Sequence, residues 1–146
     1  MGPATGRFTA EFPAYGPDQM FALAADIERY PDFIHWCRQI RVLSRDGNML
    51  EIESHFGAGP IDAAFRTRAV AEPPHRLTIS TDDPPFRRFE LVWQFEAIGD
   101  GCRVVAEYAM ELHSPLIQAL ARFALPEAER KVVRRFKARA EEVYGK

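Results

Sequence analysis

Apolar and polar residues alternate along several stretches of the chain. Near the start, Phe8, Ala10 and Phe12 share one phase, and the residues between them are polar. A period of two is typical of a strand with one buried face. The alternation recurs as far as residue 112 and predicts about seven strands, at residues 7–12, 39–44, 50–56, 61–72, 76–81, 88–96 and 102–112. Turn sequences rich in Gly, Pro and Asp separate the later strands, at residues 45–48, 57–60, 73–74, 82–85 and 99–101.

Helical spacing appears between the first and second predicted strands. Apolar residues from 20 to 27 recur at helical intervals and predict a helix that ends near Tyr30. The aromatic segment 32–36 that follows is short, and we expect it to form a further helical turn packed on the sheet. These short helices would bring a large apolar area to one place.

The chain after the last predicted strand has the pattern of a long helix. Ser114 followed by Pro115 is a strong helix start, because the serine hydroxyl accepts from a free amide and proline needs no partner in the first turn. The 3.6-residue period then continues to Gly145. Pro126 predicts a kink or a short break between two helical pieces.

This order of elements indicates an α+β fold. Consecutive antiparallel strands with one apolar face need a cover, and the C-terminal helix is the only predicted element long enough to supply it. A curved sheet of this length leaves space that one helix about 10 Å wide does not fill. We therefore expect an interior cavity within one domain that spans residues 1–146. The large side chains on the inward phase are Phe56, Phe65, Phe89, Trp93, Phe95, Tyr108, Phe123 and Phe136.

The composition is that of a globular chain without a strong overall charge. Of the 146 residues, 47% are hydrophobic, and the net charge of -2 gives no bulk field that would attract nucleic acid or membrane. No apolar run approaches the roughly 18 residues of a spanning helix. The first residues have neither an apolar run nor a basic segment, so we expect no secretory leader. Cys37 and Cys102 lie far apart without metal-ligand spacing, so we expect reduced thiols and a cytoplasmic protein.

Groups that could carry out catalysis are scarce. The sequence has no nucleophile elbow, phosphate-binding loop, dinucleotide fingerprint or zinc motif. His35 and Cys37 lack a third partner in sequence and are interpreted as part of a packed turn. Almost every carboxylate falls on the solvent phase, so we predict no catalytic residue, no metal and no cofactor. The polar groups on the apolar phase, which would either orient a ligand or be ordinary satisfied hydroxyls, are Ser54, Thr67, Thr81 and Tyr108.

The C-terminal segment is more basic than the rest of the chain. Residues 127–146 contain seven basic and four acidic residues, a net charge of +3, which leaves -5 for the remainder. Such a helix face can contact anionic lipid headgroups or RNA phosphate, or it can be a solvated face with internal ion pairs. No contact with DNA is expected. The residues that would make a contact with a membrane or a ribosome are Arg130, Lys131, Arg134 and Arg135.

Three segments share an order and spacing that are specific. Residues 21–37 contain the pattern Tyr-Pro-x-Phe-x-x-Trp-Cys, and residues 84–95 contain Pro-Phe-Arg-x-Phe-x-x-x-Trp-x-Phe. The third segment is the basic helical stretch 134–145. Together these segments extend over nearly the whole chain and resemble the ubiquinone-binding, polyketide-cyclase-like START-domain family, which includes a bacterial branch of ribosome-association toxins.

The resemblance implies a helix-grip (START/Bet v 1-like) fold, in which a curved antiparallel sheet surrounds the long C-terminal helix and an internal tunnel accepts a hydrophobic ligand. By motif position it implies that the pocket or its mouth is bordered by Tyr30, Phe33, Trp36, Phe86 and Trp93. With the inward phase added, the candidate ligand-binding residues are Tyr30, Phe33, Trp36, Phe56, Phe65, Phe86, Arg87, Phe89, Trp93, Tyr108, Phe123, Val132 and Phe136.

The leading hypothesis is a non-enzymatic bacterial carrier of ubiquinone or a related isoprenoid lipid that supports cellular respiration, in the cytoplasm or peripherally at the inner membrane. Hydroxyl groups or Arg87 would donate to the quinone carbonyls, and apolar burial at about 25 cal/mol per Å2 would supply most of the affinity. One alternative is a polyketide aromatase or cyclase, which needs a titratable pair in the cavity. Another is a ribosome-associating protein, whose binding through the basic helix would weaken with salt.

Overall fold

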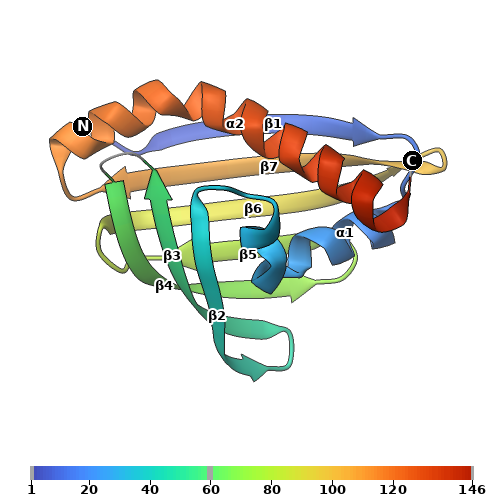
Figure 1. The fold of residues 1–146 in the computed structure, drawn as a ribbon, viewed down its shortest axis with the longest axis horizontal. Helices are drawn as coiled ribbons and strands as arrows, with labels where there is room; N and C mark the ends of the chain where they lie inside the picture. The colour runs from blue at the N-terminus through green and yellow to red at the C-terminus, as the bar shows by residue number, and fades with distance from the viewer. Residues whose placement is uncertain (1, 59–60, 146) are drawn as a thin grey trace.

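The computed structural model describes residues 2–58 and 61–145 and contains seven strands, two α-helices and one 3-10 helix in those ranges. The predicted order of elements, one strand, short helices, six strands and a long helix, is confirmed (Figure 1). The elements are β1 (Ala4–Phe12), α1 (Pro17–Ala25), η1 (Ile27–Asp32), β2 (Cys37–Asp46), β3 (Met49–Ala58), β4 (Ile61–Glu72), β5 (Arg76–Thr81), β6 (Phe86–Ile98), β7 (Gly101–Leu112) and α2 (Pro115–Tyr144).

The strands form one antiparallel sheet in the order β1-β7-β6-β5-β4-β3-β2. Neighbours in sequence are neighbours in space from β2 to β7, and β1 joins the far edge by pairing with β7. Figure 1 shows that the sheet curls strongly, because β2, β3 and β4 cross the direction of β1, β6 and β7. The predicted turn at 57–60 lies partly outside the described residues, since 59 and 60 are not described.

The long helix α2 lies across the concave face of this sheet and is attached near both ends (Figure 1). Near its start, the Gln118 side chain accepts from the Leu112 amide at 2.7 Å and donates to the Met110 carbonyl at 3.2 Å. At its end, the Tyr144 hydroxyl donates to the Gln19 carbonyl at 2.7 Å, and the Tyr15 hydroxyl donates to the backbone just beyond the helix. The predicted α+β class, a curved sheet with one covering helix, is confirmed.

The first helix is shorter than the sequence pattern predicts. It ends at Ala25 instead of near Tyr30, and the chain continues as the 3-10 helix η1. The backbone leaves the helical conformation at Asp26, where φ is -83° and ψ is 66°, so the α-helix ends there. Residues 33–36 form turns rather than the further helical turn that the aromatic segment predicts.

The predicted start of α2 is confirmed, and of the kink or break predicted at Pro126 the structure shows a bend in a continuous helix. The Ser114 hydroxyl accepts from the Ile117 amide at 3.2 Å, and Pro115 occupies the first helical turn. The helix continues through Pro126 to Tyr144. Pro126 and Arg122 are exposed, so water can reach the carbonyl that the proline leaves without an amide partner. Figure 1 shows the helix bending part-way along its length, as an internal proline produces.

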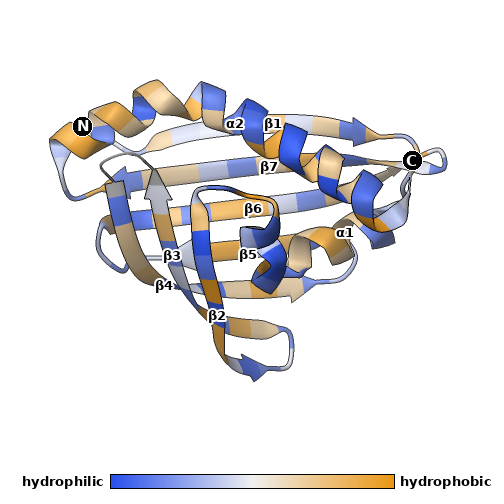
Figure 2. Ribbon diagram, in the orientation of Figure 1, coloured by the Kyte–Doolittle hydropathy of each residue, from blue (hydrophilic) through white to orange (hydrophobic). Residues whose placement is uncertain are grey.

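The core lies between the concave face of the sheet and the helices. Its central positions are small or fully enclosed side chains, including Ala106 on β7 and Ala140 on α2, which have no exposed surface. Leu77 and Ile52 fill the sheet side, and Met20 fills the α1 side. Figure 2 shows hydrophobic residues along α1 and the central strands, whereas the second half of α2 is largely hydrophilic outside its inner face. Within the described residues, no helix combines the length and the apolar character needed to cross a membrane.

A glycine at the start of β7 provides a test of this packing. A Cβ added at Gly101 would lie 2.6 Å from the Phe12 carbonyl oxygen and 2.6 Å from Pro13 Cα, which are backbone atoms that cannot rotate away. We expect Gly101→Ala to lower the free energy of unfolding by about 2 kcal/mol, as overpacking does elsewhere. Urea denaturation measures the change. The matched control is Gly2→Ala, where nothing lies within 4 Å, and a similar loss in both variants would contradict the packing argument.

Candidate functional site

The inner face of α2 meets the sheet through one aromatic side chain, Phe136. Its ring is 5.4 Å from that of Trp93 on β6, 5.8 Å from Tyr30 in η1 and 5.1 Å from Phe33, measured between centroids. The contacts with Tyr30 and Phe33 are edge-to-face, an arrangement that aromatic quadrupoles favour. Phe8 on β1 continues the cluster on the other side of Trp93 at 6.0 Å. Phe136 therefore joins the helix, η1 and the sheet.

A small apolar cavity lies next to this cluster. Its volume is about 20 Å3, which is room for about one water molecule. The expected interior cavity is therefore small among the described residues, because large aromatic side chains occupy much of the concave face that the curvature of the sheet creates. The residues around the cavity are Phe8, Ala10, Phe12, Met20, Ala24, Trp93, Phe95, Val104, Val132, Val133 and Phe136.

One polar atom in this apolar region has no protein partner. The indole nitrogen Nε1 of Trp93 is buried and has no hydrogen-bond acceptor among the residues that the structure describes. The side chain as a whole is only 5% exposed, and it lines the cavity. An indole N–H can only donate, and a buried donor without an acceptor costs about 1–3 kcal/mol. Trp93 is therefore suited to receive an acceptor atom from a molecule in the cavity.

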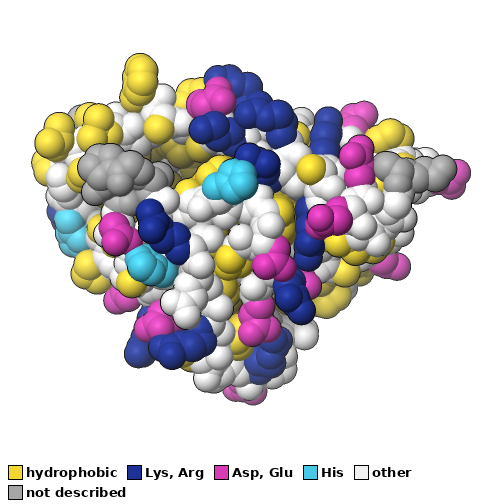
Figure 3. Space-filling model, viewed as in Figure 1, with side chains coloured by type: hydrophobic (Ala, Val, Ile, Leu, Met, Phe, Trp, Pro, Cys, Tyr) yellow, Lys and Arg dark blue, Asp and Glu magenta, His cyan; other side chains and the backbone are white. Residues whose placement is uncertain are grey.

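A second aromatic cluster lies at the end of the sheet where α2 begins. It is a row of four rings whose successive centroids are 5.5, 4.9 and 5.3 Å apart, formed by Phe56, Phe65, Phe86 and Phe89. Phe86 is opposite Leu112, whose amide donates to Gln118, so the row lies near the first half of α2. Apart from Phe65, these rings are only partly buried. Figure 3 shows a hollow below this part of the helix with hydrophobic side chains in it.

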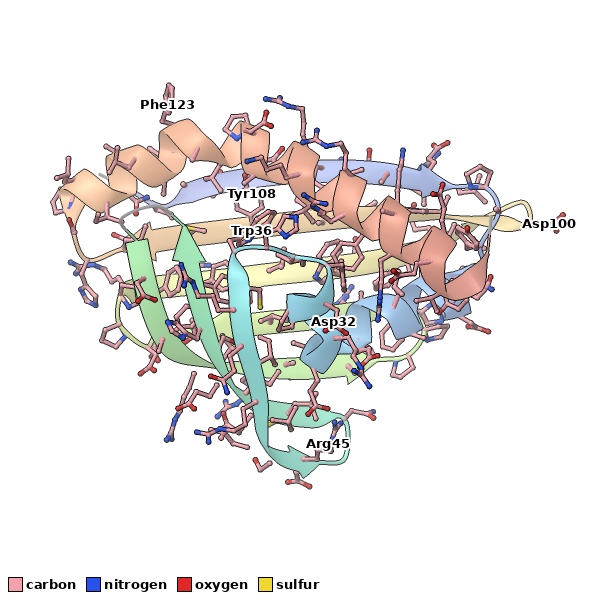
Figure 4. The ribbon with its side chains drawn as sticks, viewed as in Figure 1. Asp32, Trp36, Arg45, Asp100, Tyr108 and Phe123 are labelled. Carbon is pink, nitrogen blue, oxygen red and sulfur yellow. The ribbon has the colours of Figure 1, made fainter. Side chains whose placement is uncertain are left out.

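Tyr108 and Glu129 form a polar pair beneath the middle of α2 (Figure 4). The Tyr108 hydroxyl on β7 donates to the Glu129 carboxylate on α2. Burial is the main cause that raises the pKa of Tyr108 above its ordinary value, and the hydrogen bond to Glu129 and its negative charge raise the pKa further. Gly6 on β1 makes room for the ring, since a Cβ there would lie 2.3 Å from the hydroxyl oxygen.

Glu129 was not predicted from the sequence, because the charges of this helix were considered only as an exposed basic face with internal ion pairs. The observed ion pairs of the exposed face join Glu127 to Arg130 at 2.7 Å and Glu127 to Arg134 at 3.6 Å. A signal was present, because Glu129 lies seven residues before Phe136 and therefore on the same inward face of the helix.

Most of the predicted site residues fall into these two clusters. Trp93, Val132 and Phe136 line the cavity, and Tyr30 and Phe33 contact Phe136. The row at the other end contains Phe56, Phe65, Phe86 and Phe89. Trp36 is partly buried against the core, and its carbonyl accepts from the Gly57 amide near the end of β3. Tyr108 reaches the cavity region through its contact with Phe8.

The predicted inward orientation of Phe123 is wrong. Its side chain is 88% exposed and points away from the sheet (Figure 4). Phe123 precedes Phe136 by thirteen residues, which at 3.6 residues per turn places the two side chains on nearly opposite faces of the helix. Phe123 is therefore an apolar residue of the outer face, although it fits the apolar period of the helix.

Arg87 is also outside the two clusters. Its guanidinium pairs with the Glu111 carboxylate at 3.8 Å, and Glu111 lies on the polar phase of β7. The register of β6 and β7 shifts between Phe86 and Arg88, so Arg87 is the extra residue of a bulge. The expectation that Arg87 donates into the pocket is therefore not met by its position.

The two cysteines are poorly suited to nucleophilic chemistry. Cys37 and Cys102 are free buried thiols, and burial raises the pKa of each to about 11, which keeps them protonated and poorly nucleophilic at neutral pH. Thr81 is engaged locally, since its hydroxyl donates to the Arg66 carbonyl and accepts from the Asp83 amide. Within residues 2–58 and 61–145, no group of three or more His, Cys, Asp or Glu side chains could hold a metal ion.

An open, polar depression lies beyond the end of β5. It is lined by three arginines and four acidic residues, and part of this charge is already paired, as between Arg68 and Glu51 at 3.6 Å. This mixture suits water and salt better than an apolar ligand. The residues that line it are Glu51, Arg66, Thr67, Arg68, Ser80, Thr81, Asp82, Asp83, Arg88, Phe89 and Glu90.

The pair beneath α2 predicts a pH dependence of stability. In the folded state the pKa of Tyr108 is raised, so its phenol stays neutral where the unfolded chain, with an ordinary value of 10.0, ionises. The stabilisation is complete below pH 10 and is lost as the pH rises toward the folded-state pKa. We expect the free energy of unfolding to fall less steeply in Tyr108→Phe than in the wild type between roughly pH 9 and pH 11. Urea denaturation across this range measures both slopes, and equal slopes would contradict the prediction.

Comparison with known proteins gives relatives over nearly the whole chain. The ribosome association toxin RatA of Pseudomonas aeruginosa is 29% identical over 132 residues, which cover 90% of this chain and 92% of the relative. The mitochondrial coenzyme Q-binding protein COQ10 homolog B of Xenopus laevis is 26% identical over 134 residues, which cover 88% of this chain and 55% of that protein.

Solved structures and family comparison agree with this relationship. A START superfamily protein from Mycobacterium smegmatis has a TM-score of 0.82 at 15% identity, with 97% of this chain and 99% of that chain covered. This likeness confirms the predicted START/Bet v 1-like fold. The profile of the family described as polyketide cyclase / dehydrase and lipid transport matches residues 13–137. The chain therefore belongs to the polyketide cyclase / dehydrase and lipid transport family, which confirms the family resemblance found in its sequence.

Proposed function

We propose that the protein is a carrier that binds an apolar small molecule between its sheet and α2, and that an isoprenoid quinone such as ubiquinone is this ligand. The observation that carries the proposal is the buried indole N–H of Trp93, which lines an apolar cavity and has no acceptor among the described residues. Membership of a family whose description includes lipid transport supports a hydrophobic ligand. The likeness to a coenzyme Q-binding protein supports a quinone.

The chemistry of the cavity region matches that of a quinone. The surrounding side chains are apolar or aromatic, so burial of a ligand tail, at about 25 cal/mol per Å2, supplies affinity without a charged partner. Quinone carbonyls only accept hydrogen bonds, and the indole N–H only donates. The Glu129 carboxylate also only accepts, and its Tyr108 partner already donates to it. A quinone head would therefore lie beside Trp93 and not beside Glu129.

Binding requires an opening larger than the cavity in this structure. Small-molecule sites enclose about 300–1,000 Å3, whereas this cavity has about 20 Å3. The helix α2 is the element best able to move, since only Gln118, Phe136 and Ala140 of its residues are buried. The partly buried aromatic row beneath its first half offers an apolar path from the surface. We propose that the ligand enters there and displaces aromatic side chains.

The titratable pair beneath α2 does not favour a cyclase. Proton abstraction from a polyketide needs a base whose acceptor oxygen is available. In this chain the Tyr108 hydroxyl donates to one oxygen of the Glu129 carboxylate and links it to β7, and the raised pKa of Tyr108 retains its proton. The pair therefore supports a role in fastening α2 to β7, and we retain a carrier over a polyketide aromatase or cyclase.

The Trp93 hydrogen bond predicts a difference between two ligands. We expect lipid extraction and mass spectrometry of the purified protein to identify a bound isoprenoid quinone. We expect Trp93→Phe to weaken binding of decylubiquinone about fivefold, the effect of one neutral hydrogen bond, and to leave binding of decylbenzene unchanged within about twofold. Displacement of an environment-sensitive apolar dye measures both affinities.

Decylbenzene is the matched control because it has a similar tail and no carbonyl oxygen. An equal loss for both ligands would mean that Trp93 contributes only packing, which would remove the hydrogen-bond assignment. Absence of any co-purified lipid, together with no displacement of the dye by decylubiquinone, would exclude the carrier function.

A second function, association with the ribosome, is supported by the likeness to the toxin RatA and by the basic half of α2. Arg134 and Arg135 lie in this half, and Arg139 does not add to it, because it pairs with Asp32 at 3.9 Å and lies over the Phe33 ring at 5.4 Å. We expect Arg134→Ala with Arg135→Ala to reduce co-sedimentation with ribosomes about tenfold, and salt to weaken it steeply. Sedimentation that is insensitive to salt and to both substitutions would exclude this function.

A further inference from the structure

Three large apolar side chains form a line on the outer face of the first half of α2. Leu116, Leu120 and Phe123 are 70%, 48% and 88% exposed, respectively. Their spacing of four and three residues places them on one face of the helix, and we call this set the apolar crest. Figure 4 shows Phe123 pointing away from the sheet at the top of the bend in α2.

The crest differs from the other exposed apolar side chains. Elsewhere in the described residues these are spread over separate elements, as Leu43 on β2 and Ile98 on β6, which are 39% and 43% exposed. Isolated positions of this kind are normal on protein surfaces. A continuous apolar line with a fully projecting aromatic ring is typical of a surface that binds a partner.

The same outer face becomes basic beyond the crest. Arg130 follows Phe123 by seven residues and continues its line along the helix, with Lys131 and Arg134 beside it. On this outer face Glu127 pairs with Arg130 and Arg134, so these side chains together with Lys131 leave a charge of +2. Glu129, the other acidic residue of the stretch, faces the sheet and accepts from Tyr108. Figure 3 shows Lys and Arg side chains gathered over the middle of α2, next to the hydrophobic group at its first half.

The first half of α2 has the charge pattern of a segment that enters an apolar layer. Residues 115–126 contain one charged side chain, Arg122, and no acidic residue. Arg122 is directed back along the protein, where it donates to the Gly2 carbonyl. The outer face is therefore apolar at one end and cationic at the other.

We infer that this face of α2 docks on the surface of an anionic lipid bilayer. The apolar crest would insert among the acyl chains, and Arg130, Lys131 and Arg134 would lie at the phosphate level, as in amphipathic helices that bind membrane surfaces. Charge complementarity and the apolar crest together favour this occupant. RNA phosphate would attract the basic residues but gains nothing from a projecting Phe123 ring. Docking goes beyond ligand binding and does not depend on it.

Vesicle flotation tests the docking surface with the full chain. Vesicles of phosphatidylcholine containing roughly a quarter phosphatidylglycerol, in about 0.1 M salt, should bind the wild-type protein. We expect the triple variant Leu116→Gln, Leu120→Gln and Phe123→Gln to bind at least tenfold more weakly. The matched control is Leu43→Gln with Ile98→Gln, which removes exposed apolar side chains outside the crest and should bind as the wild type does. Circular dichroism verifies that each variant is folded.

A second variant separates the two parts of the surface. Arg130→Gln, Lys131→Gln and Arg134→Gln should weaken binding to the anionic vesicles at least fivefold and leave the weaker binding to pure phosphatidylcholine nearly unchanged. Docking is overturned if the wild type binds neither vesicle, or if the crest variant binds as tightly as its control. It is also overturned if the basic variant loses ribosome binding while the crest variant and the wild type show no difference on vesicles, since the face would then serve RNA. The decylubiquinone measurement remains independent of all these outcomes.

Discussion

The curved sheet requires α2, because the other described helices cover only part of its apolar concave face. The helix meets that face through few side chains. Phe136 joins it to β6 and η1 in its second half, and Gln118 joins it to the C-terminal end of β7 near its start. Between these attachments the inner surface holds a small cavity and the Tyr108–Glu129 pair. The position of each of these features depends on how α2 is held.

The two faces of α2 have different chemistry. Its inward stripe packs on aromatic rings, while its outward stripe changes from apolar to basic along the helix. A helix that only covered a core would need a uniformly polar outer face. The low charge of residues 115–126 and the projecting Phe123 therefore support the proposed docking of the outer face, whereas the inner face packs on the sheet.

The sequence was sufficient to predict the strands of the sheet. The alternation of apolar and polar residues marks each strand, and Gly, Pro and Asp mark the turns between the later strands. For example, the predicted strand at 76–81 has the same bounds as β5 (Arg76–Thr81), and Ser114 caps α2 as predicted. Side-chain direction on α2 was harder, because apolar character alone does not distinguish a buried Phe136 from an exposed Phe123. The prediction for Arg87 was wrong because the strand has a bulge at this residue, and no residue type in the sequence indicates a bulge there. The cavity size depends on how aromatic rings pack in three dimensions, which periodicity does not describe.

The free energy of inserting the apolar crest into a bilayer can be compared with that of the contacts that hold the first half of α2 on the sheet. The first half of α2 is held near its start by the two hydrogen bonds of Gln118, each worth about 0.5–1.5 kcal/mol net. Transfer of one large apolar side chain such as Phe123 from water into an apolar layer contributes about 1.5–3 kcal/mol. Insertion of the crest into a bilayer is therefore of the same order as the attachment that keeps this half of the helix on the sheet. A bilayer surface would offset the cost of lifting α2 over the aromatic row, where an apolar ligand would have to pass.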